Sequence, residues 1–455
     1  MFSTSTAPTT PKAAGVSFVC PAGSMLSACK SLEAFRKGKA EVFGLVADSV
    51  FFECSGAGVY VEAFGLSSSF LACVGDAVGA GSFSLPWDAF FAFVKATKGK
   101  GSLSYEAGKL LASVSGSSLS LAAGDGKRCH ADVTLPGEEE WLGADQLASL
   151  ESLAGACLPG DAAGFPVDPV LRASNFCSDD AAKEILSGVY LSEELRSIVG
   201  TDGHTLYRSS IHEGSGVIAW GAWLPGWLFS VLQAGLTAKG KKALGFPWAF
   251  YFQGAAGARA VRCWVNHSLL IAVRWRDCGA SYPQVDQLIP DASKLSSSFS
   301  FQRETLEAAL LPIVKALKSS AGKPLMDCSF DGETGRLFIE AELFSKVGGT
   351  RNAPELESIG TQEGSAVVTA ERFFPDPRVH EPGFYEKPEK EQATFLSVWE
   401  ASRSFCVNAL YLERLLKAWK AEGSDRVHLS FSGGKALFFE TGSSQALLMP
   451  VLRRR

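Results

Sequence analysis

Internal repetition constrains this chain of 455 residues more than any single motif does. A strand, a short helix and a hairpin of alternating apolar and polar residues occur three times, beginning at Gly81, Val217 and Ser404. Pro86 and Pro225 mark the starts of the first two helices, because proline is favoured at the first helical position. The repetition predicts three domains of one fold.

A second half-domain precedes each of these copies and also opens with a helix. We expect these helices at Met25–Lys37, Pro169–Asn175 and Gln302–Leu310, each followed by alternating strands. Each domain would then pack two helices against antiparallel sheets. The predicted fold class is therefore α+β.

The predicted domain boundaries follow stretches rich in proline, glycine and acidic residues. We expect a disordered tail at 1–15, a first domain at 16–140, a linker at 141–165, a second domain at 166–292 and a third at 293–455. The third domain carries a Pro/Glu-rich insertion at about 348–393. This insertion is expected to be a surface insertion or a partly mobile loop, or alternatively a family-specific partner-binding site.

Composition excludes several classes of protein. Apolar residues make up 46% and charged residues 20%, which is typical of globular chains. The eleven cysteines are scattered singly, and neither they nor the six histidines have metal-ligand spacing, which predicts reduced thiols in a cytoplasm and no metal or other cofactor. The uncharged segment 217–238 is long enough for a bilayer, but Pro225 interrupts it, so we expect a strand and a buried helix and no membrane association.

The stretch from Gly188 to Ile211 alternates apolar and polar residues twice, which predicts two adjacent strands. It contains an Asp202–Gly203 dipeptide. Such a dipeptide favours a tight turn, because aspartate bonds to its own backbone and glycine accepts a positive φ. The turn would carry Thr201, His204 and Leu206 at one end of a sheet.

The sequence Thr201-Asp202-Gly203-His204 resembles the corresponding turn of the bacterial DNA polymerase III beta subunit, the beta sliding clamp family. The segment 282–290 resembles a domain joint of that family, and the segment 447–451 resembles its C-terminal ending. The resemblance covers nearly the whole chain and is weakest in the first domain. It implies a head-to-tail dimeric ring that encircles duplex DNA and tethers polymerase and clamp loader subunits, without enzymatic activity.

The resemblance also implies a pocket for short peptides between the second and third domains. Its residues carry over as Leu186, Thr201, Gly203, His204, Leu206, Pro283, Leu288, Asn408, Tyr411, Leu447, Leu448, Met449, Pro450 and Val451. Thr205, Asp286 and Gln287 replace arginines of the family, and Arg453–Arg455 replace its usual ending. These departures predict weaker binding of the family's usual peptides.

Packing geometry gives a second reason for a dimer. Helices packed side by side lie about 8–10 Å apart, so the six predicted helices of one chain would enclose a bore of less than about 20 Å. Twelve helices from two chains would enclose a bore of about 35 Å, which admits duplex DNA with a layer of water.

Basic residues occur in or near every predicted helix although the net charge is −5. The predicted phosphate-facing set is Lys30, Arg36, Lys37, Lys95, Lys98, Arg172, Lys183, Lys239, Lys241, Lys242, Lys315, Arg414, Lys417 and Lys420. Weak contacts of this kind do not depend on base sequence. The alternative is that lysine and arginine simply favour helix C-termini through the helix dipole.

Two other functions stay open. Asp202 and His204 could act as acid–base or metal groups of an enzyme, but no nucleophile motif, phosphate-binding loop or carboxylate pair accompanies them. A clamp-like scaffold that is never loaded on DNA is the other alternative. A sliding clamp remains the preferred prediction.

Overall fold

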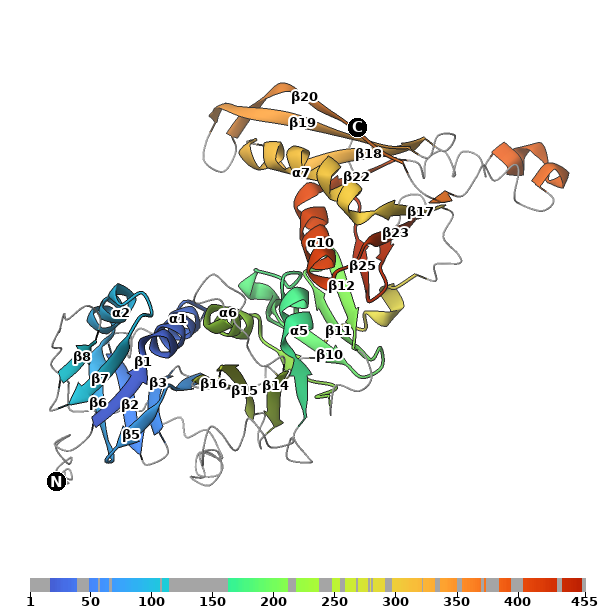
Figure 1. The fold of residues 1–455 in the computed structure, drawn as a ribbon. Helices are drawn as coiled ribbons and strands as arrows, with labels where there is room; N and C mark the ends of the chain where they lie inside the picture. Colours follow the sequence, from blue (N-terminus) through green and yellow to red (C-terminus); the bar gives the residue numbers. More distant parts are fainter. Residues whose placement is uncertain are drawn as a thin grey trace, which may run out of the picture. The chain divides into compact units, whose positions relative to one another are not determined.

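The computed structural model of the chain contains several antiparallel sheets with helices packed against them (Figure 1). It describes residues 17–38, 49–55, 58–64, 68–106, 109–113, 163–211, 218–236, 248–253, 258–266, 269–276, 279, 281–290, 297–320, 322–331, 336–349, 354–369, 372–373, 384–393, 404–431 and 436–451. The predicted tail and residues 141–162 of the predicted linker lie outside this set. The predicted mixture of helices and antiparallel sheets is confirmed.

The chain divides into two compact units. Unit 1 comprises Met1–Leu171 and His212–Ser281, and unit 2 comprises Arg172–Ile211 and Tyr282–Arg455. The boundary passes through the predicted second domain, because the two halves of that domain join different sheets. The division into three domains stays a prediction.

Unit 1 contains two sheets. The first has the order β5-β1-β7-β8, with β1 Ser17–Pro21, β5 Asp76–Val78, β7 Ser102–Glu106 and β8 Lys109–Ala112. The second has the order β6-β2-β3-β4-β16-β15-β14-β9, with β2 Ser49–Ser55, β3 Gly58–Phe64, β4 Ser68–Cys73, β6 Gly81–Pro86, β9 Gly164–Pro166, β14 Trp248–Gln253, β15 Ala258–Asn266 and β16 Leu269–Arg276. The pairing of β4 with β16 joins a strand of the predicted first domain to a strand of the predicted second domain.

Aromatic side chains fill the core of unit 1 between its sheets and helices. Phe83 stacks on Phe52 at 4.7 Å and on Tyr105 at 4.0 Å between ring centroids. The helices in the described part of this unit are α1 Ala22–Gly38, α2 Trp87–Ala96 and α6 Gly226–Leu236, and α5 Val167–Ser174 contains the boundary to unit 2. Helix α1 lies beside α6 (Figure 1), and the hydroxyl of Ser31 donates to the carbonyl of Val231 at 2.8 Å.

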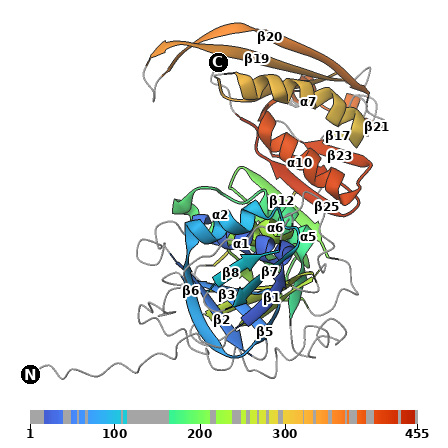
Figure 2. The ribbon, with the colours of Figure 1, turned by 60° about the vertical axis from the view of Figure 1, so that its left-hand side comes forward.

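Unit 2 also contains two sheets. The strands of its larger sheet have the order β10-β11-β12-β25-β24-β23-β17-β21, with β10 Val189–Ser192, β11 Ser197–Thr201, β12 Thr205–Ser210, β17 Ser297–Gln302, β21 Arg372–Phe373, β23 Arg426–Phe431, β24 Leu437–Glu440 and β25 Ser444–Leu448. The smaller has the order β20-β19-β18-β22, with β18 Leu325–Asp331, β19 Arg336–Gly349, β20 Pro354–Thr369 and β22 Ser404–Asn408. The long strands β19 and β20 run beside helix α7 Arg303–Ser319 (Figure 2), and the second long helix is α10 Ala409–Glu422.

Several predicted elements are confirmed at their starts. Helix α2 begins at Trp87 directly after Pro86, and α6 begins at Gly226 directly after Pro225. The described residues of the apolar segment 217–238 therefore include a short strand, β13 Trp223–Leu224, followed by α6, as predicted. Among the described helices, none combines the length and apolar character that a bilayer crossing needs.

The sequence prediction was wrong about the stretch 188–211, which forms three strands and not two. An additional turn separates β10 from β11: the amide of Arg196 donates to the carbonyl of Glu193 at 3.3 Å, and the amide of Leu195 donates to the hydroxyl of Ser192 at 3.2 Å. Arg196 has φ +46°. A turn built by serine and arginine lacks the glycine or proline signal that sequence reasoning depends on.

Two predictions about the third domain were also wrong. Helix α7 continues to Ser319, well past the predicted end at Leu310, because Pro312 sits on its exposed side and the carbonyl that loses its hydrogen bond can reach water. The insertion at about 348–393 was expected to be a loop, but it contains strand β20, which pairs with β19 from Pro354 to Thr369. Its Pro/Glu/Gly-rich composition obscured the strand.

Candidate functional site

The predicted Asp202–Gly203 turn lies between β11 and β12 in unit 2, and side chains fix its shape. The Oδ1 atom of Asp202 accepts hydrogen bonds from the amides of His204 at 2.8 Å and Thr205 at 2.7 Å. The hydroxyl of Thr201 donates to the carbonyl of Thr205 at 2.7 Å and accepts from the amide of Gly203 at 3.1 Å. Gly203 has φ +89°, as the turn requires.

The end of the chain lies directly beside this turn. Strand β25 pairs with β12 so that Leu447 stands opposite Leu206. Beyond the strand, the amide of Met449 donates to the carbonyl of His204 at 2.9 Å, and the amide of Val451 donates to the carbonyl of Cys406 at 2.7 Å. These bonds place the predicted residues 447–451 against the predicted turn, with Pro450 half-buried between them.

An apolar cluster forms the floor next to the turn. Leu206 and Leu447 are buried in it together with Val199, Val285 and Phe438. Two further predicted residues are apolar and exposed: Leu288 is 60% exposed and Met449 is 49% exposed. Large apolar side chains exposed next to a buried apolar floor are typical of a surface that binds an apolar segment.

Leu448 points away from this floor. Neighbouring residues of a strand face opposite sides of the sheet, and Leu448 is fully buried in the interior of unit 2, where it lines a small cavity with Leu412 and Phe439. It therefore supports the strand and offers no surface to a ligand.

Helix α10 starts next to the turn and is linked to it. The Asn408 side chain accepts a hydrogen bond from the amide of Leu410 at 2.9 Å, which caps the helix. Tyr411 stacks on His204 with 6.3 Å between ring centroids. Arg414 lies over the ring of Tyr411 at 5.7 Å and within 4.0 Å of the Asp202 carboxylate.

The surroundings of Tyr411 also shift its pKa. Burial raises the pKa of Tyr411 above its usual value, and the negative charge of Asp202 raises it further. Asp202 is occupied with two backbone amides and lies near Arg414, so its carboxylate serves the turn. No group of three or more potential metal ligands occurs within the described part of the chain.

The two predicted residues Leu186 and Pro283 come from neighbouring segments. Leu186 is half-buried in the 3₁₀ helix Ala181–Ser187, and its Cδ1 atom lies 3.9 Å from the position that a Cβ would take at Gly203. Pro283 is exposed, and the neighbouring Tyr282 stacks on Tyr190 at 4.8 Å. The fold thus brings the turn, Leu186, the start of α10 and the segment 447–451 together, and the segment 282–289 borders the same apolar cluster.

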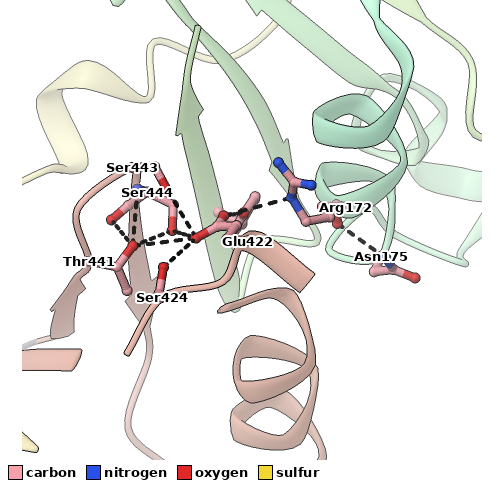
Figure 3. Close-up of polar contacts among 8 residues, drawn as sticks. Arg172, Asn175, Glu422, Ser424, Thr441, Ser443 and Ser444 are labelled. Carbon is pink, nitrogen blue, oxygen red and sulfur yellow. Dashed lines mark hydrogen bonds and ion pairs between the residues drawn. The ribbon is translucent and has the colours of Figure 1, made fainter. Parts of the chain in front are cut away.

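Sequence reasoning missed Glu422, which holds the opposite end of the β12–β25 pair (Figure 3). Its side chain is only 2% exposed. The carboxylate accepts hydrogen bonds from the hydroxyls of Tyr207 and of Ser444, the latter at 2.9 Å, and lies 3.8 Å from Nε of Arg172. Further hydroxyl donors lie at 3.3–3.4 Å, namely Ser424, Thr441 and Ser443.

This buried carboxylate joins three elements of unit 2. Glu422 is the last residue of α10, Tyr207 lies on β12, and Ser444 opens β25. Burial raises the pKa of Tyr207, and the neighbouring Glu422 adds to the rise. One signal could have revealed Glu422 in the sequence: an acidic residue at a helix C-terminus opposes the helix dipole and therefore needs compensating donors.

Most of the predicted phosphate-facing residues of the described chain already have partners. Arg36 lies over the Trp87 ring at 4.5 Å and Lys95 lies 5.9 Å from the centre of the Phe91 ring. Ion pairs engage Lys37 with Glu33, Arg172 with Glu422, Arg414 with Asp202, Lys417 with Glu413 and Lys420 with Glu307. Lys30 is half-buried and also makes a contact, whereas Lys98, Lys183 and Lys315 are exposed. Lys239, Lys241 and Lys242 lie outside the described residues.

No protein-family model matches the chain, and no curated protein sequence matches it. Solved structures match its fold. The DNA polymerase III beta chain of Streptococcus pneumoniae matches with a TM-score of 0.62 and 13% identity, over 96% of this chain and 100% of that chain. The DNA polymerase sliding clamp of Bacillus subtilis matches with a TM-score of 0.61 and 13% identity, over 97% of this chain and 100% of that chain.

A third match was solved with a ligand. The Helicobacter pylori beta clamp bound to a DNA ligase peptide matches with a TM-score of 0.57 and 13% identity, over 96% of this chain and 100% of that chain. These likenesses show that the chain has the fold of the bacterial beta sliding clamps.

Proposed function

We propose that this chain, which has the fold of the bacterial beta sliding clamps, is itself a DNA sliding clamp. Two copies would form a ring around duplex DNA, and the ring would hold a polymerase and other proteins on the DNA through short peptides. The chain would act as a processivity factor of the cytoplasm and catalyse no reaction of its own. Its partners would be duplex DNA, a replicative polymerase and a clamp loader.

The order of strands in the sheets carries the proposal of a ring. In unit 1, β4 ends one half-domain and pairs with β16 of another, and in unit 2 β12 pairs with β25 in the same way. Like β4 and β12, strand β20 is the last strand of a half-domain that opens with a helix, here α7. It is the outermost strand of its sheet among the described residues. Strand β8, which ends the other type of half-domain, is likewise outermost in the first sheet of unit 1 among the described residues.

A second copy of the chain can satisfy both edges at once. Unpaired strand edges expose backbone groups that readily pair with another strand. If β20 of one copy pairs with the β8 side of the other, the reverse pairing forms by symmetry and the ring closes. Both junctions would then repeat the arrangement already present at β4–β16 and β12–β25.

The site in unit 2 supports the proposed peptide binding. Its floor is apolar, Met449 and Leu288 are exposed beside it, and Arg414 and His204 add polar groups at its edge. Methionine adapts to varied apolar side chains, which suits a site that serves several partners. The DNA ligase peptide bound to the Helicobacter pylori clamp agrees with this role for the fold.

The proposal is tested by loading the purified chain onto nicked circular DNA with a clamp loader and then cutting the circle. A ring held by topology stays on the circle at high salt and is lost from the ends of the cut DNA. A dimer that is never retained on the circle would instead support a scaffold without DNA loading. A monomer of 48.3 kDa that is never retained contradicts the proposal.

A further inference from the structure

Two glutamates bridge α7 and α10 in unit 2, and each of them binds two cations. Glu307 of α7 accepts from Arg303 at 2.6 Å and from Lys420 of α10 at 2.9 Å. Glu413 of α10 accepts from Lys417 at 2.8 Å and from Lys318 of α7 at 2.7 Å. The two helices lie side by side (Figure 2), so these four ion pairs line the seam between them.

The carboxylates lie deeper than the lysines. The side chains of Glu307 and Glu413 are 16% and 11% exposed, respectively. The side chains of Lys318, Lys417 and Lys420 are 48%, 66% and 61% exposed, respectively. An anion that approaches the seam therefore meets lysines whose positive charge is already balanced by the more deeply buried carboxylates.

The compensation persists at neutral pH. Hydrogen bonding from Lys420 lowers the pKa of Glu307. Burial acts to raise the pKa of Glu413, but hydrogen bonds from Lys318 and Lys417 outweigh it and leave that pKa lowered. Both glutamates are thus ionised wherever the protein is folded near neutrality.

We propose that Glu307 and Glu413 weaken the contact between this seam and DNA phosphates, so that the ring slides instead of sticking. The inference rests on the proposed function. A ring threaded by DNA is retained by topology and needs no strong phosphate contact. A lysine that is already paired with a glutamate gains less binding free energy from a phosphate. The free-energy barrier that the ring crosses when it slides from one phosphate to the next is lower as a result.

Lys315 provides an internal comparison. It is exposed on α7, three residues before Lys318 and so on a neighbouring part of the same face, and it has no ion pair among the described residues. Lys315 would therefore contact phosphate at its full strength.

The test measures binding of the full-length chain to a short blunt-ended DNA duplex by fluorescence polarisation at several salt concentrations. Glu413→Gln removes one charge and releases two lysines, and Glu307→Gln releases one. Each released lysine that reaches a phosphate adds up to about 0.9 to the slope of log affinity against log salt. We expect the double variant to bind several-fold more tightly than the wild type, with a steeper slope.

Glu304→Gln is the matched control. Glu304 also lies on α7 and carries the same charge, but its side chain is 86% exposed and it pairs with Arg303 at 3.2 Å, not with a lysine. We expect it to bind DNA almost as the wild type does. If the Glu307 and Glu413 variants bind no more tightly than this control, the inference is wrong.

Lysine variants, made in the wild type and in the Glu413→Gln variant, give a second test. In the wild-type background, Lys315→Ala should lower DNA affinity more than Lys417→Ala does, and Lys417→Ala should matter more once Glu413 is glutamine. Equal losses in the two backgrounds overturn the inference. If the wild type is retained on circular DNA while the variants bind equally, only this inference fails; if no chain binds or is retained, the proposed function fails with it.

Discussion

Replacing Glu422 by alanine tests whether one buried carboxylate holds the floor of the candidate site. Hydrogen bonds to a charged acceptor contribute about 1.5–3 kcal/mol each, and an unpaired buried donor costs about 1–3 kcal/mol. Alanine would leave the phenol of the fully buried Tyr207 without its Glu422 acceptor, whereas Ser444 keeps the hydroxyl of Thr441 at 2.9 Å. Arg172 is partly exposed and can turn to water.

Removal of the carboxylate also removes the cost of burying its charge, which offsets part of the loss. We expect the free energy of local opening of β12 and β25 to fall by about 2–4 kcal/mol. A fall of about 3 kcal/mol corresponds to amide exchange about a hundredfold faster, since about 1.4 kcal/mol is tenfold. Hydrogen exchange followed by mass spectrometry on peptides from both strands measures this directly in the full chain.

Ser424→Ala is the control for this experiment. It removes a hydroxyl that lies 3.3 Å from the same carboxylate and leaves the donors from Tyr207 and Ser444 in place. We expect it to change the opening free energy by less than about 1 kcal/mol. If Glu422→Ala exchanges within about threefold of the wild type, the carboxylate does not hold the two strands and the reasoning is refuted.

Three further predictions concern the site, the thiols and the response to acid. Met449→Ala should weaken peptide binding in a titration without lowering the thermal stability, because Met449 is half-exposed. Leu447→Ala should destabilise the chain by about 2–5 kcal/mol, because Leu447 is buried. Equal stability of the two variants would contradict this assignment. Eight of the eleven cysteines lie in the described part of the chain, and all eight are buried. Burial raises the pKa of Cys20 and of Cys263 to about 12. Mass spectrometry after alkylation of the native protein at neutral pH should therefore find none of these eight modified, and modification of any of them would contradict this. The pKa of Glu413 is lowered from 4.5 in the folded state, so acid protonates this group more readily in the unfolded state. Its contribution to stability is therefore full above about pH 4.5 and is lost as the pH falls through the pKa of the folded state. Urea unfolding of Glu413→Gln should accordingly lose less stability than the wild type between neutral pH and about pH 3, and identical losses would count against the ion pairs.

Local signals were sufficient to predict much of the fold. Pro86 and Pro225 located the starts of two helices, because proline is favoured at the first helical position. The turn at Asp202 was predictable because a single side chain makes it: one carboxylate oxygen satisfies two backbone amides. Such features depend on neighbours in the sequence, and the sequence therefore reveals them.

The features that sequence reasoning missed depend on residues far apart in the chain. Glu422 meets Tyr207 and Ser444 only after β12 and β25 have paired. Lys420 looked like a free phosphate ligand because Glu307, which pairs with it, lies more than a hundred residues earlier. The pair of Lys417 with Glu413, in contrast, spans only four residues of α10, and helical spacing could have revealed it. The orientation of Leu448 was also predictable. Neighbouring residues of a strand face opposite sides of the sheet, so Leu447 and Leu448 could not both have lined the same pocket.

Electron microscopy of the purified full-length chain would show whether two copies join their half-domains through shared sheets and close into a ring. We expect a particle of two copies with a central channel of about 35 Å, wide enough for a DNA duplex. A single compact copy without a channel, or a dimer whose copies meet away from β20 and the β8 side, would contradict it.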